Sequence, residues 1–298
     1  MKPPYGQVKT GEMEKVSMKI NVINTYKEIR KFIERIKNGE SPNVCWEEEV
    51  LSAYWDKLCR YAPIDLSARK PKVISDISVL EKQCDLLEML DTDSLEKEFE
   101  RVAAVLPNYD DDPITVAIFP SDNDDICVNS KQNGVVGTSL FGNIMIQVNP
   151  IIQGYEAWIR YVFAHEYHHT VWGNFWFMLH GGELQNKFID SLVIDGEADS
   201  FALELYPELK PEWLFGMSEK EIISLWENKC IDLVERTDVD YGSYMFGNDE
   251  GGIPWCAGYA VGFFLVQKYL CITNESVVDI LELKPELLLK KLISEKII

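Results

Sequence analysis

The sequence is poor in basic residues, and this shortage excludes two classes of partner. Of its 298 residues, 29 are Lys or Arg and 49 are Asp or Glu, so the formal net charge is −20. A chain with this charge repels nucleic-acid phosphates and anionic lipid head groups. We therefore expect neither a nucleic acid nor a membrane surface as a partner.

Clustered cysteines and long apolar runs are also missing. The seven cysteines are odd in number, lie far apart and form no Cys-x-x-Cys pair, whereas a disulfide framework or zinc ribbon needs closely spaced, even-numbered cysteines. No apolar segment typical of a signal peptide follows the first residues, and the apolar stretch Tyr259 to Val266 is too short to span a bilayer. These absences predict a cytoplasmic protein with free thiols.

Several common catalytic signatures are absent as well. The chain contains no Gly-x-Ser-x-Gly, no phosphate loop ending in Gly-Lys-Ser/Thr and no Gly-x-Gly-x-x-Gly. These absences argue against a nucleophile-elbow hydrolase, a phosphate-loop nucleotidase and a dinucleotide-dependent enzyme.

Apolar periodicity divides the chain into helical and strand-forming stretches. From about Asn24 to Leu106, apolar residues recur every three or four positions, which predicts helices. After the acidic run that ends at Pro113, the period changes to two in Ile114–Phe119 and Gly142–Pro150, which predicts strands. From Tyr155 onward the pattern is helical again. We expect an amino-terminal helical region over residues 1–112 and a second domain over residues 113–298.

Histidine is rare, and its distribution indicates a metal site. The four histidines stand at positions 165, 168, 169 and 180, and His165-Glu166-Tyr167-His168-His169 has the pattern His-Glu-x-x-His. A helix turns about 100° per residue, so His165 and His169 lie about 40° apart on one face and can bind one metal ion. Glu166 then stands beside the metal, within reach of a proton of metal-bound water. We expect His168 to be a core residue or a neighbour of the site.

A third, acidic ligand is expected on a second helix, because catalytic zinc commonly takes three protein ligands and one water. The stretch from Ile194 to Ala202 supplies two choices, Asp195 and Glu197. Asp199 lies one turn after Asp195, where it can accept the free ring N–H of a ligand histidine and fix its tautomer. Glu197 points about 200° away from Asp195, so only one of the two acids can face the metal.

The chain resembles the YjaZ-like family of predicted zinc-dependent proteases, a group of His-Glu-x-x-His metallopeptidases of the zincin type. The resemblance covers roughly residues 113–290 and rests on four segments: Gly134–Pro150, His165–Thr170, Asp195–Ala202 and Pro254–Gly262. In that family the presumed third ligand is a Glu at the position of Asp195. The shorter aspartate leaves Asp195 and Glu197 open as ligands.

The resemblance implies an α+β, zincin-like fold. We expect a small, mostly antiparallel sheet, an active-site helix that carries the histidines, and a helical carboxy-terminal lobe. The strand Ile144–Val148 is expected at the sheet edge, where its main chain would bind an extended peptide.

The resemblance further implies a zinc peptidase that acts on a peptide or protein substrate. Zinc would polarise the scissile carbonyl and acidify its water, while Glu166 would act as the general base and then protonate the leaving amine. Tyr259 is the expected donor to the oxyanion, with Tyr244 and His180 as weaker choices. Gly258 and Gly262 equally fit a close helix contact in which Tyr259 only packs. The alternative function is a binding or regulatory protein that keeps the zincin fold without useful turnover.

Overall fold

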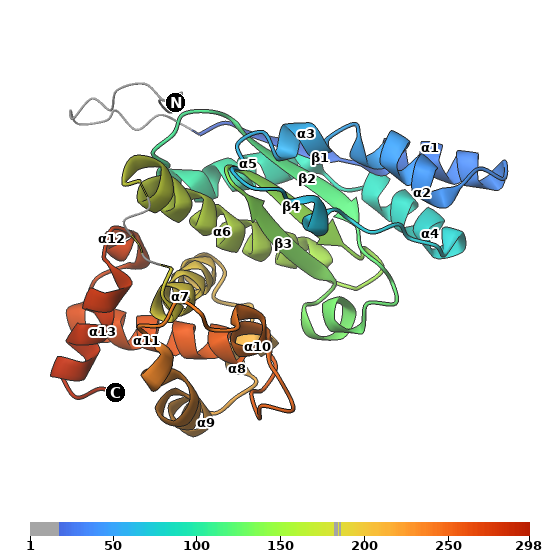
Figure 1. The fold of residues 1–298 in the computed structure, drawn as a ribbon. Helices are drawn as coiled ribbons and strands as arrows, with labels where there is room; N and C mark the ends of the chain where they lie inside the picture. The colour runs from blue at the N-terminus through green and yellow to red at the C-terminus, as the bar shows by residue number, and fades with distance from the viewer. Residues whose placement is uncertain (1–17, 182–183, 185) are drawn as a thin grey trace.

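A four-stranded mixed sheet forms the centre of the upper half of the molecule (Figure 1). The computed structural model describes residues 18–181, 184 and 186–298, so the amino-terminal residues examined for a signal peptide lie outside the described residues. The strand order is β1-β2-β4-β3, with bounds β1 Ile20–Asn24, β2 Ile114–Pro120, β3 Val135–Leu140 and β4 Asn143–Val148. β1 pairs with β2 and β2 with β4 in parallel, and only β3 and β4 are antiparallel. The α+β class is confirmed, but the expected mostly antiparallel sheet is wrong.

The strand β1 accounts for one of the two parallel pairs, and it lies within residues 1–112, where a helical region is expected. The helices that follow β1 form a crossover long enough to return the chain as a parallel strand. Their bounds, with the short π and 3₁₀ turns named η, are α1 Tyr26–Lys37, α2 Pro42–Cys45, η1 Trp46–Leu51, α3 Trp55–Leu58, η2 Ser67–Arg69, α4 Ile77–Glu88 and α5 Thr92–Val105. The sheet therefore contains strands from both sides of residue 112. The division of the chain at that residue stays a prediction.

The edge of the sheet is formed by β3 and not by β4. β4 lies between β2 and β3, so the expectation that Ile144–Val148 forms the edge is wrong. Between β2 and β3 the chain forms the π-helical turn η3 (Cys127–Lys131). β3 and β4 are joined by the two-residue turn Phe141-Gly142, in which both residues have positive φ, as such hairpin turns require.

Helices cover both faces of the sheet. Ile144, Ile146 and Val148 share one side of β4, as the alternation predicts, and pack in one core cluster with α5 and α6 (Tyr155–Gly173). Met145 points to the opposite face, into a second core cluster with α1, η1 and α4. Because the two inner strands are covered on both faces, every residue of β2 is buried.

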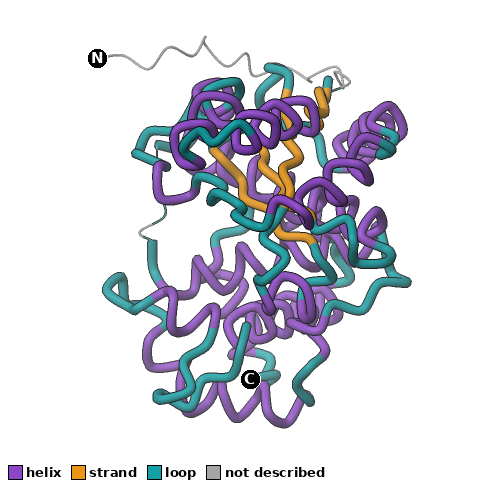
Figure 2. The backbone as a smooth tube through the Cα atoms, turned by 90° about the vertical axis from the view of Figure 1, so that its right-hand side faces the viewer, coloured by secondary structure: helices purple, strands orange, loops and turns teal. Residues whose placement is uncertain are grey.

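The carboxy-terminal part of the chain forms a helical lobe below the sheet in Figures 1 and 2. It follows α6 and the π-helical turn η4 (Asn174–Leu179) and has its own core cluster. Its elements are α7 Phe188–Leu205, α8 Glu212–Phe215, α9 Glu219–Leu225, η5 Trp226–Cys230, η6 Ile231–Leu233, α10 Tyr241–Phe246, α11 Ala257–Thr273, α12 Val277–Ile280 and α13 Pro285–Ser294.

Two glycines allow α7 and α11 to cross with their backbones in contact. A Cβ placed on Gly196 of α7 would lie 2.3 Å from the carbonyl oxygen of Gly262, and a Cβ on Gly262 of α11 would lie 2.0 Å from the carbonyl oxygen of Leu192. Neither position can carry a side chain without separating the helices. This crossing places the first turn of α11, with Tyr259, close to Asp195 on α7.

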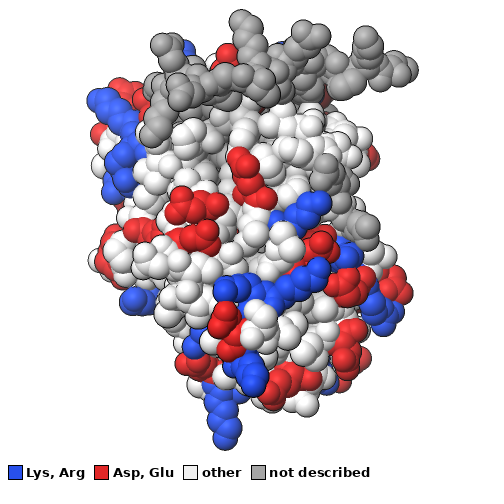
Figure 3. Space-filling view, turned by 90° about the vertical axis from the view of Figure 1, so that its left-hand side faces the viewer, with Lys and Arg blue, Asp and Glu red and all other residues white. Residues whose placement is uncertain are grey.

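The surface and the helix lengths bear on the expected partners. On the face drawn in Figure 3, acidic side chains are interspersed with basic ones and no continuous basic patch is seen. Among the described residues, no helix is both long and apolar enough to cross a membrane. All seven cysteines lie in the described part of the chain, and each is a free thiol.

Candidate metal centre

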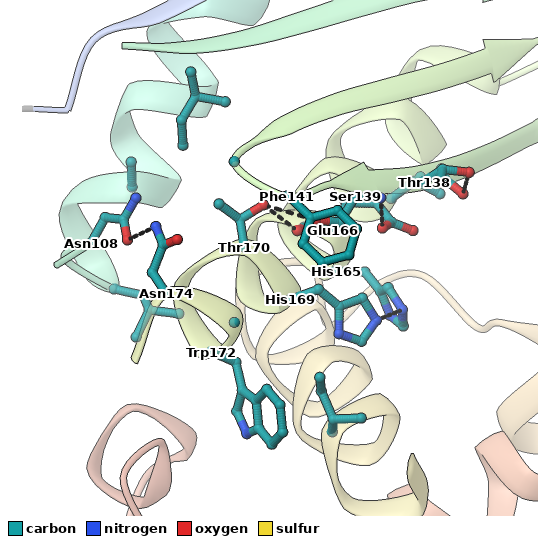
Figure 4. A pocket seen from close by; sticks show the side chains of 18 of the residues that line it. Asn108, Thr138, Ser139, Phe141, His165, Glu166, His169, Thr170, Trp172 and Asn174 are labelled. Atoms are coloured by element: carbon teal, nitrogen blue, oxygen red, sulfur yellow. Dashed lines mark hydrogen bonds between the residues drawn. The ribbon is translucent and has the colours of Figure 1, made fainter. Parts of the chain in front are cut away.

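Three potential ligand atoms converge where α6 meets α7. His165 and His169 stand one turn apart on α6, and Asp195 projects from the middle of α7. The Nε2 atoms of His165 and His169 are 3.0 Å apart, and Asp195 Oδ1 lies 3.3 Å from His169 Nε2 and 3.7 Å from His165 Nε2. Figure 4 shows the two imidazoles facing each other in the pocket.

This triangle fits a zinc ion. Zinc bonds imidazole nitrogens at about 2.0–2.1 Å and carboxylate oxygens at about 2.0–2.2 Å in a tetrahedral arrangement, so two of its ligands lie about 3.3 Å apart. The three observed distances, 3.0, 3.3 and 3.7 Å, bracket this separation. The donor set of two nitrogens and one carboxylate oxygen leaves a fourth position for water or substrate, as catalytic zinc sites do.

Asp199 orients one of the two histidines from behind. Its Oδ1 lies 3.2 Å from His165 Nδ1, and because a carboxylate only accepts, this ring nitrogen carries the proton. Tyr161 Oη and Trp213 Nε1 also donate to Asp199 Oδ1, at 3.0 and 3.1 Å. The network keeps a fully buried carboxylate hydrogen-bonded and turns His165 Nε2 toward the cluster.

The carboxylates and histidines of the cluster shift one another's pKa values. Burial acts to raise the pKa of Asp195, but its contacts with His165 and His169 outweigh burial and lower it to about 2. Burial acts to lower the pKa of His165, but the charge of Asp199 and the contact with Asp195 raise it well above its usual range. Asp195 is therefore ionised, as a metal ligand must be, and a metal ion would displace a proton from His165.

Glu166 lies next to the cluster, between α6 and the edge strand. Its Oε2 accepts a hydrogen bond of 2.6 Å from the backbone N–H of Ser139 on β3. The Ser139 hydroxyl in turn lies 3.1 Å from Thr170 Oγ1, one turn farther along α6 (Figure 4). A Cβ on Gly137 would fall 2.5 Å from Glu166 Cγ. The glycine therefore lets β3 approach the carboxylate closely.

Glu197 and His168 lie outside the cluster. Both side chains are fully buried, and His168 Nε2 is 3.6 Å from Glu197 Oε2. Burial raises the pKa of Glu197 well above its usual range, and burial together with the neighbouring histidines lowers the pKa of His168. The structure thus brings Asp195 to the histidines and turns Glu197 toward the protein interior.

The three proposed oxyanion donors occupy different places. The ring of Tyr259 lies 6.3 Å from that of His165 and lines the same cavity. Tyr244 packs edge-on against Phe188 in the core of the carboxy-terminal lobe, and His180 lies against Phe175. Of these three, only Tyr259 is among the residues that line the cavity.

Several residues near the cluster are not singled out by the sequence. Tyr241 on α10 donates a hydrogen bond of 3.3 Å to Asp195 Oδ2, and Tyr161 and Trp213 hold Asp199. Ser139 and Thr170 join β3 to α6. Thr170 directly follows His169, and Gly137 interrupts a short β-branched run. The glycine is a signal of close backbone approach that the sequence does offer.

A cavity of about 2330 Å³ runs past the cluster. Its walls include the edge strand from Val135 to Ser139, the end of α6, η4 and the start of α11. Pockets for small ligands usually have volumes of about 300–1,000 Å³. This cavity is larger than such pockets and has space for a segment of a chain, and it is called the groove below.

Comparison with known proteins assigns the chain to a family. The family model described as "Predicted Zn-dependent protease (DUF2268)" matches residues 92–290. The uncharacterized protein YjfC of Bacillus subtilis (strain 168) is 26% identical over 245 residues, which are 72% of this chain and 80% of YjfC. The uncharacterized protein YjaZ of the same organism is 28% identical over 127 residues, 41% of this chain and 46% of YjaZ. No solved structure matches. The chain belongs to the DUF2268 family of predicted Zn-dependent proteases.

Proposed function

We propose that the protein is a zinc-dependent peptidase whose metal ligands are His165, His169 and Asp195. The observation that carries this proposal is the convergence of His165 Nε2, His169 Nε2 and Asp195 Oδ1 at separations of 3.0–3.7 Å. Membership in a family of predicted Zn-dependent proteases supports the same reaction class.

Zinc, when bound, would polarise a scissile carbonyl and acidify a water molecule. Glu166 is the group beside the cluster that can take the proton from that water and pass it to the leaving amine. The N–H of Ser139 donates to Glu166 Oε2 and holds this carboxylate beside the cluster. Asp199 fixes the His165 ring so that the Nε2 atom stays turned toward the metal.

Tyr259 is the proposed donor to the negatively charged oxygen that forms during hydrolysis. Burial, with the nearby charge of Asp195, raises the pKa of its phenol well above the usual range, so the hydroxyl keeps its proton and can donate it in a hydrogen bond. Tyr241 donates a hydrogen bond to Asp195 Oδ2 and so holds this carboxylate in place.

An extended peptide is the substrate that fits the edge strand. In β3 the N–H of Ser139 points away from β4, since it donates to Glu166. Alternate residues of a strand point their N–H groups to the same side, so the N–H of Gly137 also faces the groove. A peptide added along this edge would bind by main-chain hydrogen bonds and present its side chains alternately to the two walls.

Glu166→Gln tests the peptidase. The variant should keep about one zinc per chain and lose about two to four orders of magnitude in kcat, because only the proton acceptor is removed. Glu156→Gln, in the exposed first turn of the same helix, is the matched control and should behave as wild type. Zinc binding without any Glu166-dependent hydrolysis would favour the alternative, a zincin-fold binding or regulatory protein.

We also propose that the substrate is a peptide or protein, that nucleic acids and membrane surfaces are not partners, and that the protein works in the cytoplasm. The net charge of −20 supports the absence of polyanionic partners. Seven free cysteines, four of them buried, fit a reducing compartment.

A further inference from the structure

Exposed aromatic side chains gather in the groove. Among the described residues, five Phe or Tyr side chains are exposed, and four of them line the cavity beside the cluster of His165, His169 and Asp195. These four are Phe141, Phe177, Tyr241 and Phe246, with 39%, 40%, 43% and 49% of their surface exposed. The fifth, Phe215, is 47% exposed and lies outside the cavity. An apolar surface concentrated at one place usually marks a binding site.

The first aromatic wall is formed where α6 continues into η4. Phe177 stacks edge-on against Trp172 at a ring separation of 5.8 Å, and Met178 beside it is 46% exposed. Figure 4 shows Trp172 at the border of the pocket, one turn beyond His169. The contact with Trp172 positions the Phe177 ring, so this wall is preformed.

The second aromatic wall is formed by α10 and the start of α11. The Phe246 ring lies 5.9 Å from that of Tyr241 and 5.7 Å from that of Tyr259. The backbone carbonyl of Phe246 accepts a hydrogen bond from the N–H of Cys256, which ties α10 to α11. Because Tyr241 also donates a hydrogen bond to Asp195, this wall lies directly beside the candidate metal ligands.

The two walls lie at opposite ends of the edge strand. Near its end, β3 meets α6 through the Ser139–Thr170 contact, and α6 then runs on into the first wall. Before its start, η3 contacts the segment that joins the two helices of the second wall, because the Lys131 ammonium lies 4.6 Å above the ring of Trp255, which lies between α10 and α11. Glu166 contacts β3 between these two points. A peptide lying along β3 would therefore pass one wall, then the three candidate metal ligands, then the other wall.

We propose that the groove selects extended peptide segments with a large apolar side chain on each side of the scissile bond, one for the Phe177 wall and one for the Phe246 wall. This inference rests on the proposed peptidase function. Burying an apolar side chain between fixed aromatic rings removes apolar surface of both partners from water. Because successive side chains of a strand point to opposite faces, the two residues that flank the scissile bond point to opposite faces of the bound peptide, one toward each wall.

Internally quenched peptides test the proposal. One set carries Phe or Leu on both sides of the central bond, and the matched set carries Ser at these positions. The zinc-loaded protein should cleave the apolar set with kcat/KM about tenfold or more higher, the size expected for an apolar subsite. Phe246→Ala and Phe177→Ala should each remove most of this preference. Phe215→Ala, an equally exposed phenylalanine outside the cavity, should keep it.

Peptide binding separates this inference from the proposed function. Fluorescence anisotropy with labelled peptides on zinc-loaded Glu166→Gln protein measures selectivity without turnover, and Phe246→Leu in that background keeps an apolar side chain as a folding control. Glu166-dependent cleavage of both peptide sets at equal rates would overturn the inference and leave the peptidase standing. Selective binding lost in Phe246→Ala, without cleavage by wild type, would support the inference and overturn the peptidase. Equal binding of both sets would overturn the inference.

Discussion

Two sets of histidine and carboxylate side chains lie next to each other between α6 and α7, and they differ in their surroundings. His165 and His169 meet Asp195 at the groove, where Asp199 supports one of the histidines with a hydrogen bond of 3.2 Å. His168 Nε2 lies 3.6 Å from Glu197 Oε2, inside the protein. Within the described part of the chain, neither ring nitrogen of His168 and neither carboxylate oxygen of Glu197 has a hydrogen-bond partner.

The difference teaches that helix phase and polar support, rather than residue type, separate a candidate metal site from a core contact. At the groove, the two histidines lower the pKa of Asp195 against the effect of burial, so the carboxylate is charged. In the core, burial raises the pKa of Glu197, which favours its neutral form. A neutral acid and a neutral imidazole fit a dry interior, whereas a charged acid beside two imidazoles fits a cation.

The largest expected effect separates the two sets by their affinity for zinc. His169→Ala and Asp195→Asn should reduce zinc from about one per chain to almost none, because each removes one of three ligands. His168→Ala and Glu197→Gln, the matched changes in the core set, should leave zinc within a few fold of wild type. Metal analysis and competition with a chromogenic chelator measure this. Equal zinc loss in all four variants would mean that the two sets act as one site.

A smaller loss of zinc affinity should follow from changes to the hydrogen bonds that hold the His165 ring. Asp199→Asn keeps the shape of the side chain but replaces one charged acceptor of the His165 ring, and the loss of such a partner typically weakens metal binding by about 10- to 100-fold. Tyr161→Phe, which removes one donor to the same carboxylate, should weaken zinc less. Zinc titration of both variants gives the order. An unchanged affinity in Asp199→Asn would show that the His165 ring needs no support.

The smallest effect concerns the core set and depends on pH. In the unfolded chain Glu197 would ionise near pH 4.3, about the usual value, whereas burial raises its pKa in the folded protein. Between these two values folding takes up a proton, so the free energy of unfolding of wild type falls as pH rises. Glu197→Gln lacks this contribution and should become more stable relative to wild type as the pH rises above about 5. Urea unfolding at several pH values checks this, and a constant difference would contradict the neutral core pair.

The sequence predicts the site better than the sheet. The spacing of His165 and His169 and the four-residue step from Asp195 to Asp199 depend only on helix geometry, and the structure places these four side chains together. Tyr241 comes from a helix 46 residues farther along the chain, and no local pattern connects it with Asp195. Contacts of this kind depend on how α10 packs against α7, which a single sequence does not reveal.

The sheet was harder to predict because its topology is set by long-range pairing. Ile20–Asn24 is too short to show a strand period, and its partner β2 begins about ninety residues later. Gly137 interrupts the short β-branched run of β3, and glycine is depleted in strands, so the start of the edge strand reads as a loop. The alternating pattern correctly predicts the strand β4. Alternation alone does not distinguish an inner strand from an edge strand once helices cover both faces.

The contact between Gly196 and Gly262 has a consequence for recognising related sites. Neither glycine supplies a side chain to the candidate site, yet the two positions fix how far Tyr259 stands from Asp195, because the backbones of α7 and α11 meet there. A related chain that keeps this crossing must keep both positions without a side chain. The glycine pair is therefore a sequence marker of the assembled site that contains no chemically active residue.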